Sequence, residues 1–271
     1  MTILLLIGLA VLLIYIRVTF KLPKIGCMAL VTGGVKTGKS TLSVYMAIKR
    51  YKANLRLVRF KNIFRKIFGL SLIEEPLLYS NIPLSVPYVP LTQKLINREQ
   101  RFAFGSVIYV NEASLFADSQ MVKDMDLNER LLMFNKLIGH ELHGGYIIYD
   151  TQSISDVHYS VKRCLSNYFY IHHLSKWIPF FMVAYVRECV YSEDGSVYNT
   201  YESDLEETLK RVIIPKRVWN HFDAYCYSYV TDDLPVANKV RILSKKDSLK
   251  VKKLTSFNDI RREFYAPTKS K

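Results

Sequence analysis

The sequence predicts an α/β fold: a P-loop type of architecture in which a mostly parallel β-sheet is flanked by helices, with an antiparallel C-terminal extension and an N-terminal transmembrane helix. Three short apolar runs predict parallel strands, because each of them leads into polar residues: Cys27–Val31, Val107–Val110 and Tyr146–Tyr149. A glycine-rich loop follows the first run and precedes a segment of helical spacing. A longer run without any charge stands at the beginning of the chain.

The composition is that of a folded protein rather than a disordered tail. The chain has 271 residues, of which 49% are hydrophobic and 23% are charged. Its four cysteines are widely spread and form no Cys-x-x-Cys pair, so the sequence indicates neither a disulfide framework nor a zinc site. This length predicts one domain over 25–235 with two appendages: an anchor over 1–20 and a basic tail over 236–271.

The net charge of +14 is concentrated at the two ends of the chain. The residues before Glu74 include 13 Lys and Arg and no acidic residue, and 237–271 contains 11 basic and 3 acidic residues. The middle of the chain is therefore acidic. Basic ends of this kind suit an anionic membrane or a nucleic acid.

The first segment, 1–20, is long enough to cross a bilayer as a helix, and its first 16 residues carry no charge. A buried core helix and a cleaved signal peptide are alternatives, but the start lacks a positive region and small residues do not end the run. Lys and Arg follow only on its C-terminal side, beginning with Arg17. The positive-inside rule therefore predicts a single-pass protein with its N-terminus outside and its main domain in the cytoplasm.

The glycine-rich loop matches the phosphate-binding pattern G-x-x-x-x-G-K-[ST], between an apolar strand and a helical segment. Glycines in this pattern let consecutive N–H groups turn toward a phosphate, and the helix dipole adds to their field. We expect Lys39 to contact the β- and γ-phosphates of ATP, Ser40 to hold Mg²⁺ and Thr41 to reach the α-phosphate. The whole predicted cradle consists of Gly33, Gly34, Val35, Lys36, Thr37, Gly38, Lys39, Ser40 and Thr41.

Two further strand ends supply candidates for catalysis. Glu112 is the best candidate for a general base, because a carboxylate after a strand can polarise a water molecule in line with the γ-phosphate. Asn111 precedes it where Asp is usual, and we expect its amide to assist Mg²⁺ through a water molecule without adding charge. At the end of the third strand, Gln152 is the candidate sensor of the γ-phosphate and Thr151 is its neighbour; a structural role for both is the alternative.

An ordered set of segments resembles the zonula occludens toxin (Zot) family, which includes the gene I type morphogenesis ATPases of filamentous phages. The set contains GGVKTGKST, Tyr79–Leu84, VIYVNEAS, His143–Ser153 and the stretch 156–163, within a predicted core of 26–175. The resemblance implies an FtsK-HerA-like P-loop ATPase fold and a homo-oligomeric ring with an arginine supplied in trans. Arg163 is the position carried over, with Arg130 and Arg101 as rivals. The family's membrane span follows the ATPase domain, whereas here the apolar segment precedes it.

The resemblance implies a membrane-anchored ATPase that drives assembly and extrusion of a filamentous single-stranded DNA phage across the inner membrane of a bacterial host. Its partners would be the host membrane, the phage DNA or its protein complex, and coat and export proteins. Two alternatives stay open. One is a DNA translocase of the conjugative coupling type, whose anchors are N-terminal, and the other is a nucleotide-gated membrane scaffold with little hydrolysis, which Asn111 favours.

Two other regions carry predictions. Between 56 and 70, Phe and Ile residues recur at helical spacing among Arg and Lys, which predicts a helix that contacts a membrane surface, contacts DNA, or packs its apolar face on the domain. In the extension 176–235 we expect a buried strand over 177–186 and a hairpin over 185–201. A capping box at Ser203–Glu206 predicts a helix that Pro215 ends.

Overall fold

The computed structural model of the chain describes residues 22–97, 99–117, 125–176, 179–191, 197–199 and 209–222. The predicted anchor over 1–20, the tail over 236–271 and the capping box at Ser203–Glu206 lie outside these ranges. Of the helices inside these ranges, none combines the length and the hydrophobicity that crossing a bilayer requires.

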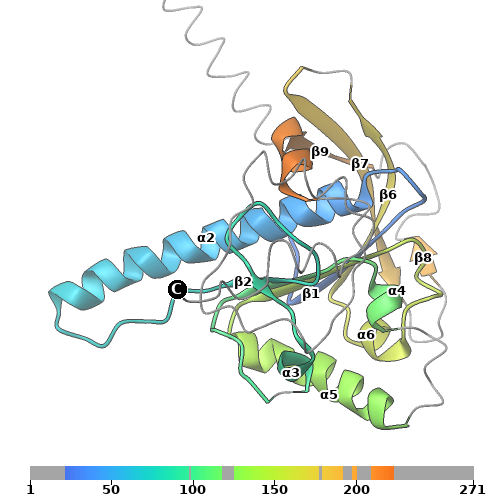
Figure 1. Ribbon diagram of the computed structural model, residues 1–271. Coiled ribbons are helices and arrows are strands. Elements are labelled where there is room, and N and C mark those ends of the chain that lie inside the picture. The colour runs from blue at the N-terminus through green and yellow to red at the C-terminus, as the bar shows by residue number, and fades with distance from the viewer. Residues whose placement is uncertain are drawn as a thin grey trace, which may run out of the picture.

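The described strands form one mixed sheet (Figure 1). Six strands pair in parallel in the order β3-β2-β4-β5-β1-β6, with β5 between β4 and β1. Apolar side chains fill both faces of its central strands, as expected for a parallel sheet covered by helices. The bounds are β1 (Met28–Thr32), β2 (Leu78–Ser80), β3 (Val89–Pro90), β4 (Val107–Val110), β5 (Tyr146–Thr151) and β6 (Asn167–Ser175).

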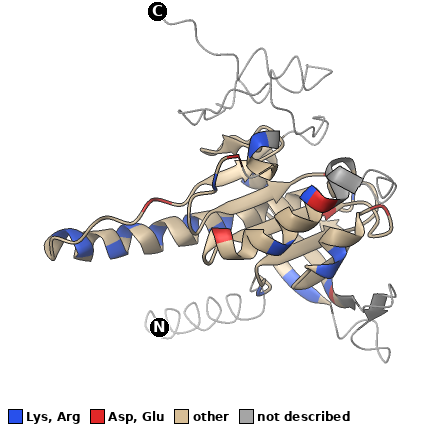
Figure 2. Cartoon of the chain, turned by 90° about the horizontal axis from the view of Figure 1, so that it is seen from below, with Lys and Arg blue, Asp and Glu red and all other residues tan. Residues whose placement is uncertain are grey.

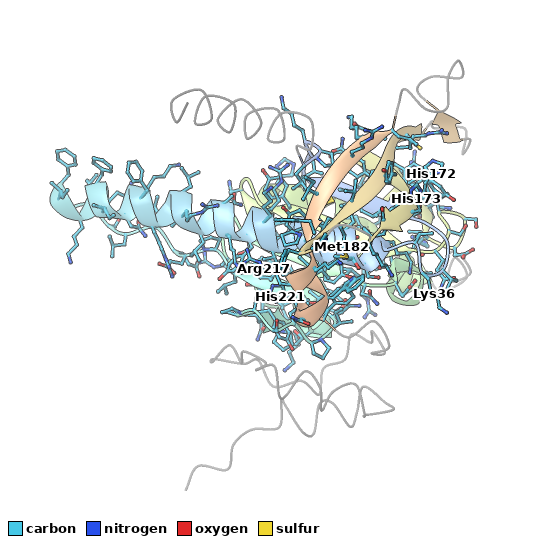
Figure 3. All side chains as sticks on the ribbon, turned by 90° about the horizontal axis from the view of Figure 1, so that it is seen from above. Lys36, His172, His173, Met182, Arg217 and His221 are labelled. Atoms are coloured by element: carbon cyan, nitrogen blue, oxygen red, sulfur yellow. The ribbon has the colours of Figure 1, made fainter. Side chains whose placement is uncertain are left out.

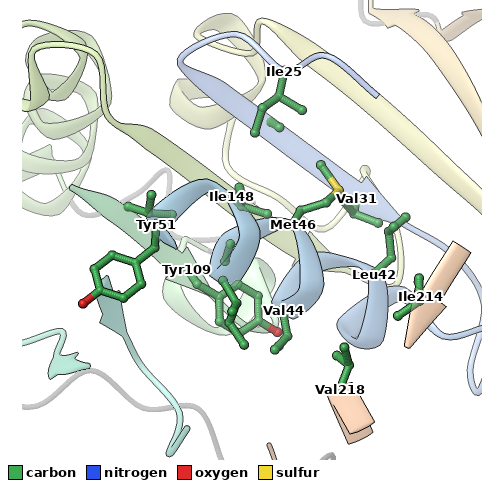
Figure 4. Packing of buried hydrophobic residues seen from close by; sticks show 14 of the residues in the cluster. Ile25, Val31, Leu42, Val44, Met46, Tyr51, Tyr109, Ile148, Ile214 and Val218 are labelled. Carbon is green, nitrogen blue, oxygen red and sulfur yellow. The ribbon is translucent and has the colours of Figure 1, made fainter. Parts of the chain in front are cut away.

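Helices cover the two faces of the sheet and enclose two apolar clusters. The first part of α2 (Lys39–Ile67) packs on one face, where Leu42, Met46 and other residues contact β1, β4 and β5 (Figure 4). The opposite face is covered by α3 (Gln93–Ile96), α4 (Ala113–Phe116), α5 (Met125–Leu142) and α6 (Tyr159–Arg163). Alternate residues of β1 point to different clusters, Val31 to the first and Leu30 to the second.

The helix α2 is longer than the sequence predicted. The helical segments expected near 42–49 and 56–70 are one continuous helix of 29 residues, about 43 Å at 1.5 Å per residue. Neither Gly nor Pro occurs between Lys39 and Phe68, so the sequence contains no residue that would interrupt the helix. Its first half lies on the sheet, and its second half projects from the domain (Figure 1).

The antiparallel extension follows β6. Strand β7 (Phe181–Tyr191) pairs with β6, with β8 (Val197–Asn199) and with β9 (Lys210–Pro215), so the predicted hairpin is confirmed. The prediction of a helix that ends at Pro215 was wrong, because 210–215 is a strand. Val212, Ile213 and Ile214 favour an extended backbone, and their pairing with β7 buries Val212 and Ile214. The 3₁₀ helix η2 (Lys216–His221) follows.

Candidate functional site

The glycine-rich loop joins β1 to the first turn of α2. Gly38 adopts a φ of 95°, which a residue with a side chain rarely adopts, and this conformation turns the chain into the helix at Lys39. A Cβ on Gly33 would lie 2.5 Å from Cγ2 of Ile171, so the loop also requires glycine where β6 passes closely. Thr37 closes the turn with hydrogen bonds from its N–H and hydroxyl groups to the carbonyl of Gly34. The loop therefore has the backbone that the phosphate-binding pattern predicts.

Lys39 of this loop and Glu112 at the end of β4 form an ion pair. Neighbouring strands lie about 4.8 Å apart, so the ends of β1 and β4, which flank β5, are about 10 Å apart. The side chains of Lys39 and Glu112 reach toward each other and bridge this distance together. Both side chains are largely withdrawn from solvent, with exposed fractions of 11% for Lys39 and 22% for Glu112. The structure thus brings together the two residues that the sequence proposed as phosphate ligand and general base.

A buried carboxylate on the intervening strand supports this pair. Asp150 of β5 is fully buried; its Oδ1 accepts a hydrogen bond from the N–H of Glu112 at 2.9 Å, and its Oδ2 accepts one from the hydroxyl of Tyr109 at 2.8 Å. The first bond fixes the backbone of Glu112, which has an unusual φ of 50° for a residue other than glycine. Asp150 and Tyr109 were not among the site residues predicted from the sequence. A charged residue in the otherwise apolar run YIIYD was the available signal.

Burial dominates the titration of this cluster. It raises the pKa of Asp150 from 3.8 to about 6, although the positive charge of Lys39 and the hydrogen bonds from Glu112 and Tyr109 act in the opposite direction. Burial and the nearby Asp150 also raise the pKa of the Tyr109 phenol well above its usual value, against a hydrogen bond with Ser40. Tyr109 therefore stays protonated and serves as a donor.

Asn111, the residue after β4, is held by two hydrogen bonds with Asn81, the residue after β2. Its N–H donates to Oδ1 of Asn81 at 2.8 Å, and its carbonyl accepts from Nδ2 of Asn81 at 2.9 Å. Its side-chain Oδ1 lies 3.1 Å from the hydroxyl of Tyr109. Tyr109 thereby connects the two predicted metal residues, Ser40 and Asn111, with the carboxylate of Asp150. Asn111 brings no negative charge to this place, but Asp150 on the adjacent strand β5 does.

Thr41, predicted to reach the α-phosphate, faces η2 at the start of α2. Its buried Oγ1 accepts a hydrogen bond from Nε1 of Trp219 at 3.1 Å, and the ammonium of Lys176 lies 4.7 Å from the centre of the Trp219 ring. The Thr41 hydroxyl keeps its own proton available for a phosphate oxygen. Figure 3 shows η2, with Arg217 and His221, beside α2, and Lys36 at the end of α2 that carries the loop.

The remaining predicted residues lie at the surface. Val35 exposes 70% of its area, and Gly34 and Lys36 are exposed with it, so this part of the loop faces solvent. Gln152 is exposed in the turn that follows β5, beside the buried Thr151, whose Oγ1 has no hydrogen-bond partner within the described residues. Arg163 is exposed at the end of α6, and Arg101 pairs with Glu74. The roles proposed for Gln152 and Arg163 stay predictions.

The order of the strands decides the type of fold. A loop of the G-x-x-x-x-G-K-[ST] pattern connects β1 to α2, and a third strand, β5, separates β1 from the strand that carries the candidate base. The carboxyl ends of these parallel strands meet at one edge of the sheet, where Lys39, Glu112 and Asp150 converge. The chain has a P-loop NTPase fold.

No protein-family model and no curated protein matches the sequence. Among solved structures, the chain is similar to the N-terminal domain of zonular occludens toxin from Neisseria meningitidis, with 14% identity and a TM-score of 0.41, over 74% of this chain and 100% of that one. It is also similar to the genome packaging NTPase B204 from Sulfolobus turreted icosahedral virus 2 in complex with ATP-gammaS (12%, 0.30, over 64% and 95%). A third similarity is to the KaiC-like protein PH0186 from Pyrococcus horikoshii OT3 (16%, 0.29, over 64% and 90%). The first of these proteins carries the name of the family that the sequence segments resemble.

Proposed function

We propose that the chain is a membrane-anchored ATPase that drives assembly and extrusion of a filamentous single-stranded DNA phage. The observation that carries the enzymatic part is the ion pair between Lys39 of the phosphate loop and Glu112 at the end of β4. It places a cation for the terminal phosphates of ATP beside a carboxylate that can accept a proton. This pairing of functions is what hydrolysis by a P-loop enzyme requires.

The residues around the pair fit a magnesium ion. Ser40 and Asn111 would hold Mg²⁺, the latter through a water molecule, since a hydroxyl and an amide oxygen are suitable ligands for this hard cation. The carboxylate of Asp150 would add negative charge near these ligands, since the hydroxyl of Tyr109 contacts both Asp150 and Asn111. When bound, the ion neutralises charge on the phosphates.

Binding and hydrolysis would use the same two side chains in succession. The phosphates of ATP compete with Glu112 for Lys39, so binding separates the ion pair and frees the carboxylate of Glu112. Glu112 then takes the proton of the attacking water as its oxygen bonds to the γ-phosphorus and the bond to the bridging β–γ oxygen breaks. Asp150 keeps the backbone of Glu112 in place throughout.

The proposed cellular role is supported by features of the sequence. The uncharged segment over 1–16 supports a single-pass location in the inner membrane of the bacterial host, with the ATPase domain in the cytoplasm. The segments that resemble the Zot family support a function in phage assembly, with single-stranded DNA, coat proteins and export proteins as partners. A homo-oligomeric ring, with Arg163 supplied to the neighbouring site, completes the proposal.

Phosphate release by the purified full chain in detergent tests the enzymatic part. We expect Mg²⁺-dependent release from ATP by the natural sequence, and losses of at least about 100-fold in Lys39→Ala and in Glu112→Gln. Single-stranded DNA is added in a parallel series to detect stimulation. A rate in the natural sequence no higher than that in Lys39→Ala, with and without DNA, would refute the motor.

A scaffold that binds ATP and hydrolyses it little is the second candidate. Two observations favour it: Asn111 brings no charge to the metal position, and Glu112 is engaged by Lys39 rather than free. The scaffold predicts that Lys39→Ala abolishes ATP binding while Glu112→Gln leaves the low basal phosphate release unchanged. The motor predicts that both variants lose phosphate release.

A further inference from the structure

The second half of α2 forms a projecting arm together with the segment that returns to β2. We define the arm as residues 52–77 (Figure 1). Hydrogen bonds tie the two parts together: Asn62 exchanges two bonds of 2.8 Å with the backbone of Ile73, and Arg59 binds Glu75 through two bonds of 2.9 and 3.0 Å. The arm is therefore a built element with a defined inner side, which the return segment covers.

The outer side of the arm is apolar and has no partner within the described residues. Its large side chains recur at intervals of three and four residues, which places them on one helix face. Phe60 and Phe64 contact each other edge to face, with ring centres 4.9 Å apart. The exposed fractions are Leu57 53%, Phe60 59%, Ile63 58%, Phe64 47%, Ile67 70% and Phe68 73%. The alternative that this face packs on the domain is therefore wrong.

Basic side chains border this apolar face on both flanks. At 100° per residue, Lys61 and Arg65 fall on one flank, and Lys52 and Lys66 fall on the other, together with Arg59, whose charge is balanced by Glu75. Figure 2 shows the resulting row of Lys and Arg along the arm. Its two acidic residues are paired, Glu75 with Arg59 and Glu74 with Arg101. An apolar stripe between two basic borders is complementary to a bilayer surface, where the rings enter the acyl boundary and the cations meet anionic headgroups.

The beginning of the described chain lies beside the base of the arm. The carbonyl of Pro23 accepts a hydrogen bond from Nη2 of Arg50 at 3.1 Å, and Leu22 packs against the core next to α2. The apolar segment 1–20 ends two residues before Leu22. An anchor inserted at that point would therefore hold the base of the arm within a few residues of the bilayer.

We propose that the arm lies along the headgroup layer of an anionic membrane, with Phe60, Phe64 and Ile67 inserted. This inference rests on the membrane location in the proposed function but not on nucleotide hydrolysis. A DNA-binding helix would present its cations outward rather than six exposed hydrophobic residues. A second copy of the chain would offer the same apolar face, but pairing two such faces would also bring the basic borders of both copies together, where like charges repel.

Photo-crosslinking tests the proposal in the full chain. A p-benzoylphenylalanine residue replaces Phe64, and the protein is reconstituted in phosphatidylcholine vesicles with about 30% phosphatidylglycerol. The matched control carries the same residue at Met133 of α5, which is 46% exposed against 47% for Phe64 and lies on the opposite face of the sheet. We expect lipid adducts at position 64 in a yield at least about fivefold above position 133. The yield should fall when Lys61→Glu and Lys66→Glu are added or when phosphatidylglycerol is omitted.

Each other outcome overturns the proposal. Equal lipid adducts at positions 64 and 133, or none at either, refute the lipid contact. Adducts to a second copy of the chain identify a subunit interface, and adducts to added single-stranded DNA identify a DNA contact. Failure of the chain to associate with vesicles refutes the arm and the membrane location together. Phosphate release from ATP, measured on the same samples, separates any of these results from failure of the nucleotide site.

Discussion

Replacing Glu112 by Gln separates the two functions that we assign to this carboxylate. In the structure Glu112 neutralises Lys39, so a triphosphate must displace it before it can bind. The two side chains expose 11% and 22%, which makes the pair stronger than an exposed surface pair, with an attraction of about 1–2 kcal/mol. Glu112→Gln removes that competition, and the affinity for ATP should increase by about 5- to 30-fold. Phosphate release should fall by about 10²- to 10⁴-fold, because the proton acceptor is lost.

The assay measures the Kd for a fluorescent ATP analogue with Mg²⁺ and the rate of phosphate release on the same preparations. Glu75→Gln is the matched control: it makes the same charge change in an ion pair on the arm, where Glu75 is 48% exposed, and should change neither quantity by more than about twofold. Weaker or unchanged ATP binding in Glu112→Gln, with Glu75→Gln like the natural sequence, would refute the competition between Glu112 and phosphate.

Three further predictions concern stability. Gly38→Ala should lower the free energy of unfolding in urea by about 2–4 kcal/mol, because a Cβ at φ 95° would also lie 2.8 Å from Cδ2 of Leu174. The control Gly69→Ala, at φ 66° with nothing within 4 Å of the added Cβ, should lower it by only about 1 kcal/mol. Equal losses in the two variants would contradict the close contact at Gly38. Burial raises the pKa of Asp150 from 3.8 to about 6. The protonated carboxyl group therefore contributes its full stability below about pH 3.8, and this contribution is lost as the pH rises through 6. Asp150→Asn should therefore shift the free energy of unfolding in the stabilising direction by about 2 kcal/mol at pH 7 relative to pH 4, and the same effect at both pH values would disprove this. Trp219→Phe should lower the free energy of unfolding by about 1 kcal/mol, because the hydrogen bond to Thr41 is lost, and should speed amide hydrogen exchange in η2. Unchanged exchange in η2 would show that this bond does not hold η2 on α2.

The parts of the site that the sequence predicted are those that local rules specify. The loop over 33–41 is recognisable because its glycines and Lys39 must stand at fixed spacing between a strand and a helix. Glu112 was identifiable because it follows an apolar strand at the position where a P-loop enzyme needs a carboxylate. The hairpin of β7 and β8 was likewise predicted from residues close together in the chain.

The parts that were missed depend on which strands are neighbours. Asp150 belongs to the site because β5 lies between β1 and β4, a fact that no short stretch of sequence contains. The sequence therefore favoured Gln152, which is polar but exposed, over the charged residue inside the strand. The helix predicted before Pro215 failed for a related reason. Its residues form β9, because pairing with β7 buries Val212 and Ile214.

Whether the apolar face of α2 is exposed depends on tertiary packing. The sequence showed an amphipathic helix over 56–70 but could not show whether the domain covers its apolar face. The structure answers this, because α2 is continuous from the phosphate loop and runs past the edge of the sheet.

A structure of the chain with Mg²⁺ and a nonhydrolysable ATP analogue tests directly whether the loop over 33–41 binds a triphosphate. We expect the triphosphate to lie against the backbone N–H groups of 33–41, and the ammonium of Lys39 to have moved from Glu112 to the phosphates. A nucleotide bound elsewhere, or an unchanged ion pair between Lys39 and Glu112 beside an empty loop at saturating analogue, would contradict it.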